Sequence, residues 1–132
     1  MSPAQQGVVA WHAYMHSGGD AALLGALVHD DAVFHSPVVH TPQAGKGKVM
    51  MYLLAAAQVL GNDSFRYVRE LVDGDNVLLE FSATIDGIHV NGIDLIQFDA
   101  DGKIIDFKVM VRPLKAVNKL WEMMGAQLQA AG

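Results

Sequence analysis

The segment Gly92–Phe98, with the sequence GIDLIQF, places one carboxylate inside a strand-like pattern. Side chains alternate across a strand, so Asp94 shares a face with Val90, Ile96 and Phe98. An ionised carboxylate among apolar groups is costly unless it is paired, hydrogen-bonded or protonated. Asp94 is therefore expected either to tie the sheet to the first helix through a structural hydrogen bond, or to face a ligand.

The second half of the chain has the segment lengths and turn residues of a β-sheet. We expect strands over residues 65–72, 77–86, 89–98 and 104–112. Turns rich in Asp, Gly and Asn separate them, at residues 73–76, 86–87 and 99–102. Their alternation of apolar and more polar positions is typical of an antiparallel sheet with one face on the core and one wetter face.

The first half of the chain has helical periodicity. Apolar spacing predicts helices over residues 5–16, 20–27 and 48–60, with a short strand over residues 32–36 and a loop over residues 42–47. Asp20 is expected to cap the second helix. Pro113 permits a last, amphipathic helix, in which Trp121 is expected to pack. Helices followed by strands indicate an α+β fold, and 132 residues suit one domain over residues 1–132.

The amino-acid composition excludes several classes of function. A hydrophobic content of 52 % with only 17 % charged residues predicts a compact globule with a lined cavity or a buried subunit interface. The net charge of −5, without a cluster of Lys or Arg, argues against nucleic acid, and no cysteine is present for thiol chemistry. Residues 2–6 lack the pattern of a secretory signal, and the apolar run 49–60 is shorter than the roughly 20 residues that cross a bilayer. A cytoplasmic location without a membrane partner is expected.

Several short motifs, in their order and spacing, resemble the nuclear-transport-factor-2-like superfamily. They are Gly19-Asp20, Asp30–Phe34 with Pro37, Gly45, Ile93-Asp94 and Gly102-Lys103. Over about residues 8–111 the chain looks most like the branch of ketosteroid isomerases and SnoaL-like polyketide cyclases. This resemblance implies a cone-shaped α+β barrel, with helices packed on a strongly curved, mostly antiparallel sheet that encloses a pocket. The helix after Pro113 is extra to the isomerase pattern.

The resemblance also suggests roles for single residues. Asp94 falls where the isomerase holds a protonated aspartic acid that stabilises an oxyanion. The proton-shuttling aspartate of the isomerase corresponds to Ser36, and a serine without an adjacent base cannot carry protons between carbons. The isomerase's helix-1 tyrosine corresponds to His12. Steroid isomerase activity itself is therefore not expected.

His12 and His16 lie four residues apart on one helical face, which the resemblance directs towards the pocket. We hypothesise that Asp94, His12 and His16 form the catalytic group, with Asp94 hydrogen-bonded to a histidine or to a ligand. The alternative is a packed or half-exposed histidine pair. The H-x-x-x-H spacing also fits a metal, but without the following Glu or a clear third ligand other than Asp94 we expect no metal.

The expected activity is that of a cofactor-independent isomerase, cyclase or dehydratase that acts on a small apolar carbonyl compound. Its ligand-binding wall is predicted to comprise Phe34, Ser36, Tyr52, Phe81, Ile96, Phe107, Val109 and Val111. The alternative is a non-catalytic module of the same fold that binds a hydrophobic ligand or dimerises. A homodimer through the sheet is expected, because several apolar residues point away from the pocket, namely Leu78, Leu95, Ile104 and Met110.

Overall fold

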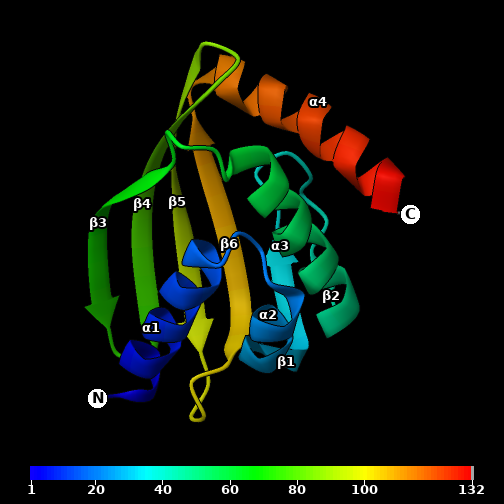
Figure 1. Cartoon of the computed structure of the whole chain (residues 1–132). Helices are drawn as coiled ribbons and strands as arrows, with labels where there is room; N and C mark the ends of the chain where they lie inside the picture. The colour runs from blue at the N-terminus through cyan, green and yellow to red at the C-terminus, as the bar shows by residue number, and fades with distance from the viewer. Residues whose placement is uncertain (132) are drawn as a thin grey trace.

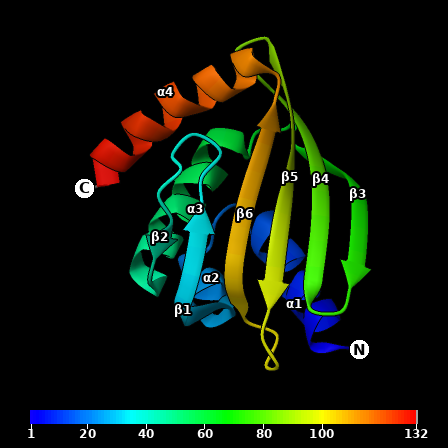
Figure 2. The ribbon, with the colours of Figure 1, turned by 180° about the vertical axis from the view of Figure 1, so that it is seen from behind.

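The computed structural model describes residues 1–131, with side chains up to residue 129. The elements in chain order are α1 (Pro3–His16), α2 (Ala21–Leu27), β1 (Val28–His35), β2 (Gln43–Ala44), α3 (Lys46–Leu60), β3 (Arg66–Asp73), β4 (Asn76–Ile85), β5 (Ile88–Phe98), β6 (Ile104–Arg112) and α4 (Leu114–Ala131). The strands form one sheet in the order β2-β1-β6-β5-β4-β3. Helices α1, α2 and α3 cover one face of this sheet, and the other face is left open (Figures 1 and 2).

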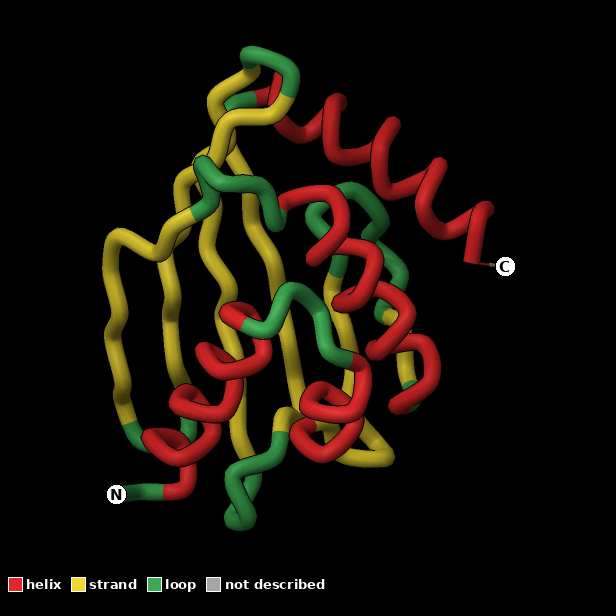
Figure 3. The backbone as a smooth tube through the Cα atoms, in the orientation of Figure 1, coloured by secondary structure: helices red, strands yellow, loops and turns green. Residues whose placement is uncertain are grey.

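The sheet is antiparallel except where β1 runs parallel to β6. Tight turns with positive φ at Gly74 and at Asp86-Gly87 join β3 to β4 and β4 to β5. In the turn between β5 and β6, Asp99 Oδ1 accepts hydrogen bonds from the backbone N–H groups of Asp101 and Lys103. The long strands bend around the helical layer, which gives the curved, unclosed sheet of the predicted cone (Figure 3).

Helix α1 is placed by its own sequence. Ser2 and Gln5 form a capping box, in which each side chain accepts the other residue's backbone N–H, and Pro3 suits the first turn. The buried residues of α1 recur every three or four positions: Ala4, Gly7, Val8, Trp11 and Tyr14. This face packs on β4 and β5, so that Trp11 lies over the middle of the sheet.

Helix α4 extends across one end of the molecule and away from the sheet (Figure 1). Its first half is held by the buried Ala116 and Leu120 and by an ion pair of 2.8 Å between Lys119 Nζ and Asp86 Oδ2. Trp121 is 65 % exposed, so the prediction that it packs is wrong. It lies on the solvent side of an amphipathic helix. No helix among the described residues has the length and hydrophobicity needed to cross a membrane.

The predicted elements are confirmed, with ends that differ by a few residues. Asp20 caps α2 as expected. Two differences have a simple cause. The two-residue strand β2 lies in the segment predicted as a loop, because so short a strand has no alternation to detect. Ile104 was expected on the outer face but is fully buried, because the β5–β6 register shifts between Gln97 and Phe98 and brings Ile104 opposite Phe98.

Candidate functional site

A cavity of about 60 Å³ lies between the helices and the sheet. Its lining consists of Trp11, Met15, Phe34, Ser36, Pro37, Val38, Leu53, Ala56, Ala57, Leu60, Phe65, Tyr67, Phe81, Asp94, Phe107, Val109, Leu120 and Met124. The empty space suits a few water molecules. A larger guest requires lining side chains to move, and the flexible thioethers of Met15 and Met124 are suited to do so.

Asp94 is the one acidic residue of this lining. Of the residues that the structure describes, it has the only buried charged side chain, with 7 % exposure. Val90, Ile96 and Phe98 are buried on the same side of β5, which confirms the face predicted from alternation. Burial raises the pKa of Asp94 to about 7, although a hydrogen bond from Tyr67 opposes the rise. Near neutral pH the carboxyl group is therefore present in both its protonated and its ionised form.

Two further side chains complete a hydrogen-bonded chain that leads to Asp94. Tyr67 Oη on β3 donates to Asp94 Oδ2 over 2.7 Å. Trp11 Nε1 on α1 donates to Tyr67 Oη over 2.9 Å. Burial, and then the nearby carboxylate of Asp94, raise the pKa of Tyr67 well above its usual value, so the phenol stays protonated.

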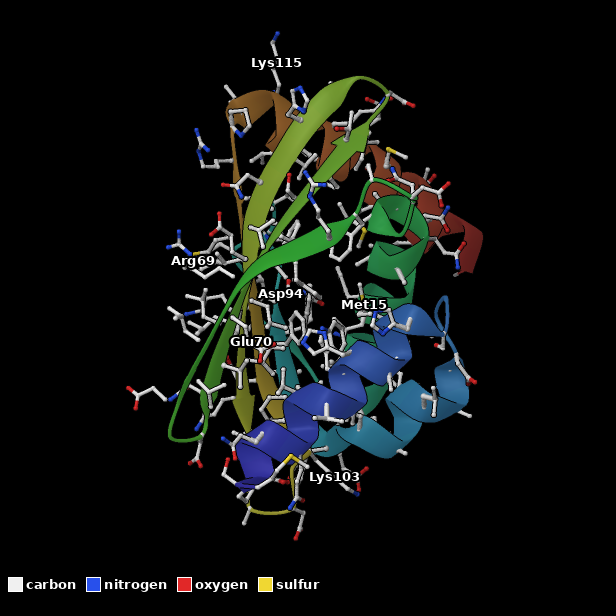
Figure 4. The ribbon with its side chains drawn as sticks, turned by 60° about the vertical axis from the view of Figure 1, so that its left-hand side comes forward. Met15, Arg69, Glu70, Asp94, Lys103 and Lys115 are labelled. Atoms are coloured by element: carbon white, nitrogen blue, oxygen red, sulfur yellow. The ribbon has the colours of Figure 1, made fainter. Side chains whose placement is uncertain are left out.

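The histidines of α1 do not join this chain. His12 Nε2 lies 2.7 Å from Glu70 Oε1 on β3, and His16 is exposed. The predicted hydrogen bond between Asp94 and a histidine is therefore wrong, and Tyr67 takes that place. Figure 4 shows that Met15 of α1 faces Asp94. On β3, Glu70 points towards α1, where it can reach His12, and Arg69 points away from α1. The helix buries its large apolar side chains, which leaves His12 at the rim.

Five of the predicted wall residues line the cavity: Phe34, Ser36, Phe81, Phe107 and Val109. Three do not. Tyr52 stacks on Phe34 with ring centroids 5.1 Å apart but is not part of the cavity lining. Ile96 is fully buried in the main core, and Val111 packs against the cluster that contains Leu120.

Two lining residues that form this hydrogen-bonded chain, Trp11 and Tyr67, were not predicted as part of the site. Among the described residues no group of three or more His, Asp or Glu side chains could hold a metal ion. The cavity wall instead supplies a carboxyl group, a phenol and the Ser36 hydroxyl. This set can exchange protons with a bound molecule and can hydrogen-bond a carbonyl oxygen.

Known proteins share this architecture. A steroid delta-isomerase from Pseudomonas aeruginosa is similar at 41 % identity over 99 % of this chain and 95 % of its own, with a TM-score of 0.92. A protein with a cystatin-like fold from Silicibacter pomeroyi DSS-3 is 30 % identical over 92 % of this chain and 84 % of its own, with a TM-score of 0.83. A protein from Jannaschia sp. CCS1 described as a SnoaL-like polyketide cyclase shares the fold alone, at 16 % identity over 90 % of this chain and 94 % of its own (TM-score 0.68).

No curated protein matches the chain. The SnoaL-like domain, in contrast, matches residues 8–107, which include most of α1, the strands from β1 to β5 and Asp94. The matched segment ends within β6, before α4, whereas the similarity to the Pseudomonas aeruginosa structure covers 99 % of the chain and so extends through this helix. With this match and the similarity to the isomerase structure, the chain belongs to the SnoaL-like domain family of the nuclear-transport-factor-2-like superfamily.

Proposed function

We propose that this protein is a cofactor-independent acid–base enzyme, an isomerase, cyclase or dehydratase, that acts on a small carbonyl compound held in the cavity. The observation that carries the proposal is Asp94, a buried carboxyl group in an apolar cavity with a pKa of about 7. A group that titrates near the working pH can accept a proton from the carbon beside a carbonyl and return it elsewhere. Perturbed carboxyl groups of this kind cluster at functional sites.

The cavity wall supports a neutral and mostly hydrocarbon substrate. Apart from the three groups that offer oxygen atoms, its described side chains are apolar or aromatic, and none is Lys or Arg. Two labelled lysines, Lys103 and Lys115, lie at opposite ends of the molecule, far from Asp94 (Figure 4). An anionic guest would meet the Asp94 carboxylate without a compensating cation.

In the proposed reaction Asp94 carries the proton, and no second carboxyl group takes part. Ser36 lines the cavity at the position that resembles the proton-shuttling aspartate of the isomerase, and its hydroxyl accepts the Val38 backbone N–H over 3.1 Å. Similarity to the Pseudomonas aeruginosa protein supports chemistry beside a carbonyl group. We keep steroid isomerisation itself out of the proposal, because Ser36 cannot replace a carboxylate. A cytoplasmic location remains part of the proposal.

A first prediction tests proton transfer without knowledge of the natural substrate. The protein is expected to accelerate the exchange of the α-protons of 2-tetralone, a neutral aromatic ketone, with D₂O, as followed by NMR. Asp94→Asn should lower this acceleration by about 10²–10⁴-fold, the usual contribution of a positioned acid–base group. Asp101→Asn, in an exposed turn, is the matched control and should retain the wild-type rate. Equal rates for both variants, or no acceleration by the wild type, would contradict the proposed function.

The outer face of the sheet supports a second proposal, a homodimer. The strand register places Leu71, Leu78 and Leu95 in one row and Ile93 beside Met110 in the next. Leu71 and Met110 are more than half exposed, at 55 % and 52 %. Apolar residues of this kind, although Lys108 and the Arg69–Glu80 ion pair continue the same two rows, favour association. If the cavity proves inert, such a ligand-binding or dimerisation module is the alternative function.

A second prediction follows from this face. Met110→Glu places a charge on this face and is expected to halve the mass measured by sedimentation velocity, because a carboxylate is costly to bury at an interface. Leu23→Glu, at a residue on α2 with 43 % exposure, should leave the mass unchanged. A wild-type protein that sediments as a monomer at every concentration would rule out the dimer.

A further inference from the structure

We propose that Trp11 and Tyr67 are positioning residues that fix which oxygen of Asp94 carries its proton: Oδ2 stays a hydrogen-bond acceptor, and the proton resides on Oδ1, at the cavity. The structural part of this inference stands by itself, whereas the use of that proton rests on the proposed function. The position of the proton follows from the direction of two hydrogen bonds.

The first bond has only one allowed direction. An indole N–H can donate but cannot accept. Trp11 Nε1 lies 2.9 Å from Tyr67 Oη, so the phenol oxygen is the acceptor. The single hydrogen of the Tyr67 hydroxyl is then directed at its other neighbour, Asp94 Oδ2, at 2.7 Å.

The second bond determines the place of the Asp94 proton. If Oδ2 were protonated and donated to Tyr67, the phenol hydrogen would have to leave the line between these two oxygens. It would then lose its acceptor in a buried environment, which is unfavourable. When Asp94 is neutral, its hydrogen is therefore on Oδ1. No fully buried side-chain oxygen or nitrogen of the described residues lacks a hydrogen-bond partner, so Oδ1 is not sealed in the core and borders the cavity that Asp94 lines.

The arrangement is held by packing from three sides. Trp11 is 3 % exposed and packs on Phe107 with ring centroids 5.0 Å apart. The Tyr67 ring meets Phe65 edge-on at 5.1 Å and the His12 ring at 5.5 Å. With the rings fixed, Oδ1 offers an O–H donor when Asp94 is neutral and a basic lone pair when it is ionised. Both forms act at the same point in space, so the carboxyl group need not rotate between accepting and returning a proton.

Three other titratable groups lie near this chain of bonds. Tyr14 on α1 is buried, and burial raises its pKa to about 12, so it stays neutral. His12 on α1 and Glu70 on β3 pair with each other at 2.7 Å on the solvent side of Tyr67. Glu70→Gln therefore serves as a control for titration of that surface pair.

The test is an NMR titration of the ligand-free protein. The chain has two tryptophans, so its two indole N–H signals report Trp11 and, as an internal control, the exposed Trp121. The Trp11 signal is expected to titrate with a midpoint near pH 7, as Asp94 ionises and polarises Tyr67, while the Trp121 signal stays constant. The same midpoint should appear in the ¹³C signal of the Asp94 carboxyl group and persist in Glu70→Gln.

The direction of the shift in Tyr67→Phe decides the proposal. If Tyr67 donates to Oδ2, the bond stabilises ionised Asp94, and its removal should raise the Asp94 pKa. If Asp94 were instead the donor, the same variant would lower this pKa and overturn the inference. Trp11→Phe should shift the Asp94 pKa upwards too, because a phenol without the indole bond is a weaker donor. Trp121→Phe should leave it unchanged.

A Trp11 indole signal that does not follow Asp94 in the wild type would also overturn the inference, and this result needs no variant to fold. These outcomes are independent of turnover. A protein that shows the expected titration but exchanges no ketone protons would retain the hydrogen-bond arrangement and lose the proposed function. If the protein exchanges ketone protons but Tyr67→Phe lowers the Asp94 pKa, the proposed function is retained and the hydrogen-bond arrangement is overturned.

Discussion

Asp94→Asn is expected to make the protein more stable than the wild type at about pH 8, and to leave its stability at about pH 4 nearly unchanged. The folded protein holds this carboxyl group in an apolar cavity, where the ionised form is unfavourable. Asparagine has a similar shape and carries no charge. Its carbonyl oxygen can accept the hydrogen bond that Tyr67 now donates to Asp94 Oδ2.

The direction of the pH dependence follows from the two pKa values. Burial raises the pKa of Asp94 from 3.8 to about 7, so between these values the folded chain holds a proton that the unfolded chain has lost. The free energy of unfolding of the wild type therefore falls as the pH rises from about 4 to about 7. Between these two pH values the free energy of unfolding of the wild type falls by about 4 kcal/mol, at 1.36 kcal/mol per pKa unit. Asp94→Asn has no carboxyl group at this position, so its free energy of unfolding does not fall in this way.

The measurement is urea unfolding at a series of pH values for the wild type and Asp94→Asn. Asp101→Asn, in the exposed turn between β5 and β6, is the control and should follow the wild type at every pH. A constant difference between Asp94→Asn and the wild type across the series would show that Asp94 titrates normally. A gain in stability on removal of the carboxyl group is the pattern of a residue retained for function.

The face of Asp94 could be predicted from sequence because strand side chains alternate with a period of two. Every residue of β5 from Val90 to Phe98 obeys that alternation. The prediction failed just beyond it, at Ile104, where one extra residue in β6 shifts the register. A bulge of this kind leaves no mark in an alternating pattern of apolar residues.

The partners of Asp94 were harder to predict, because they depend on how α1 is rotated over the sheet. His12 and Trp11 are neighbours in sequence and point about 100° apart around the helix, so the rotation of α1 over the sheet decides which of them faces the cavity. The hydrophobic face that includes Trp11 and Tyr14 is buried, so His12 reaches Glu70 at the rim instead. One signal in the sequence could have indicated Trp11 and Tyr67: a buried tryptophan or tyrosine needs a hydrogen-bond partner for its polar atom.

The cavity results from how the helices pack on the sheet and cannot be predicted from the alternation of apolar residues in the sequence. Apolar residues on the sheet face predict burial, but only the positions of the helices decide whether an empty space remains between them. Leu120 and Met124 of α4 close one part of the lining. The sequence predicted this helix as amphipathic, although its contact with the cavity could not be inferred from its stripe alone.

Gly92→Ala is expected to destabilise the fold by about 3 kcal/mol, because the strand has no room for a side chain at this position. A Cβ atom there would lie 2.5 Å from Cζ of Phe81 and 2.7 Å from the backbone carbonyl oxygen of Met110. The carbonyl oxygen belongs to β6, which is paired with β5, so it cannot retreat without disturbing the sheet. Phe81 is 1 % exposed and stacks on Phe65, with ring centroids 5.4 Å apart.

Gly47→Ala is the matched control, since a Cβ atom at this exposed position in α3 meets no atom within 4 Å. Alanine there should be neutral or stabilise the helix by up to about 1 kcal/mol. Urea unfolding measures both variants, and an equal effect of the two substitutions would show that the sheet tolerates a side chain at Gly92.

The same contact links this glycine to the site. Phe81 lines the cavity, and Gly92 and Asp94 point to the same face of β5, so the empty space is the nearest place for a displaced Phe81 ring. A Gly92→Ala protein that still folds should therefore bind 2-tetralone more weakly, although its Asp94 is intact. Unchanged ketone binding in that variant would mean that the Phe81 ring moves elsewhere, and that the glycine serves the sheet alone.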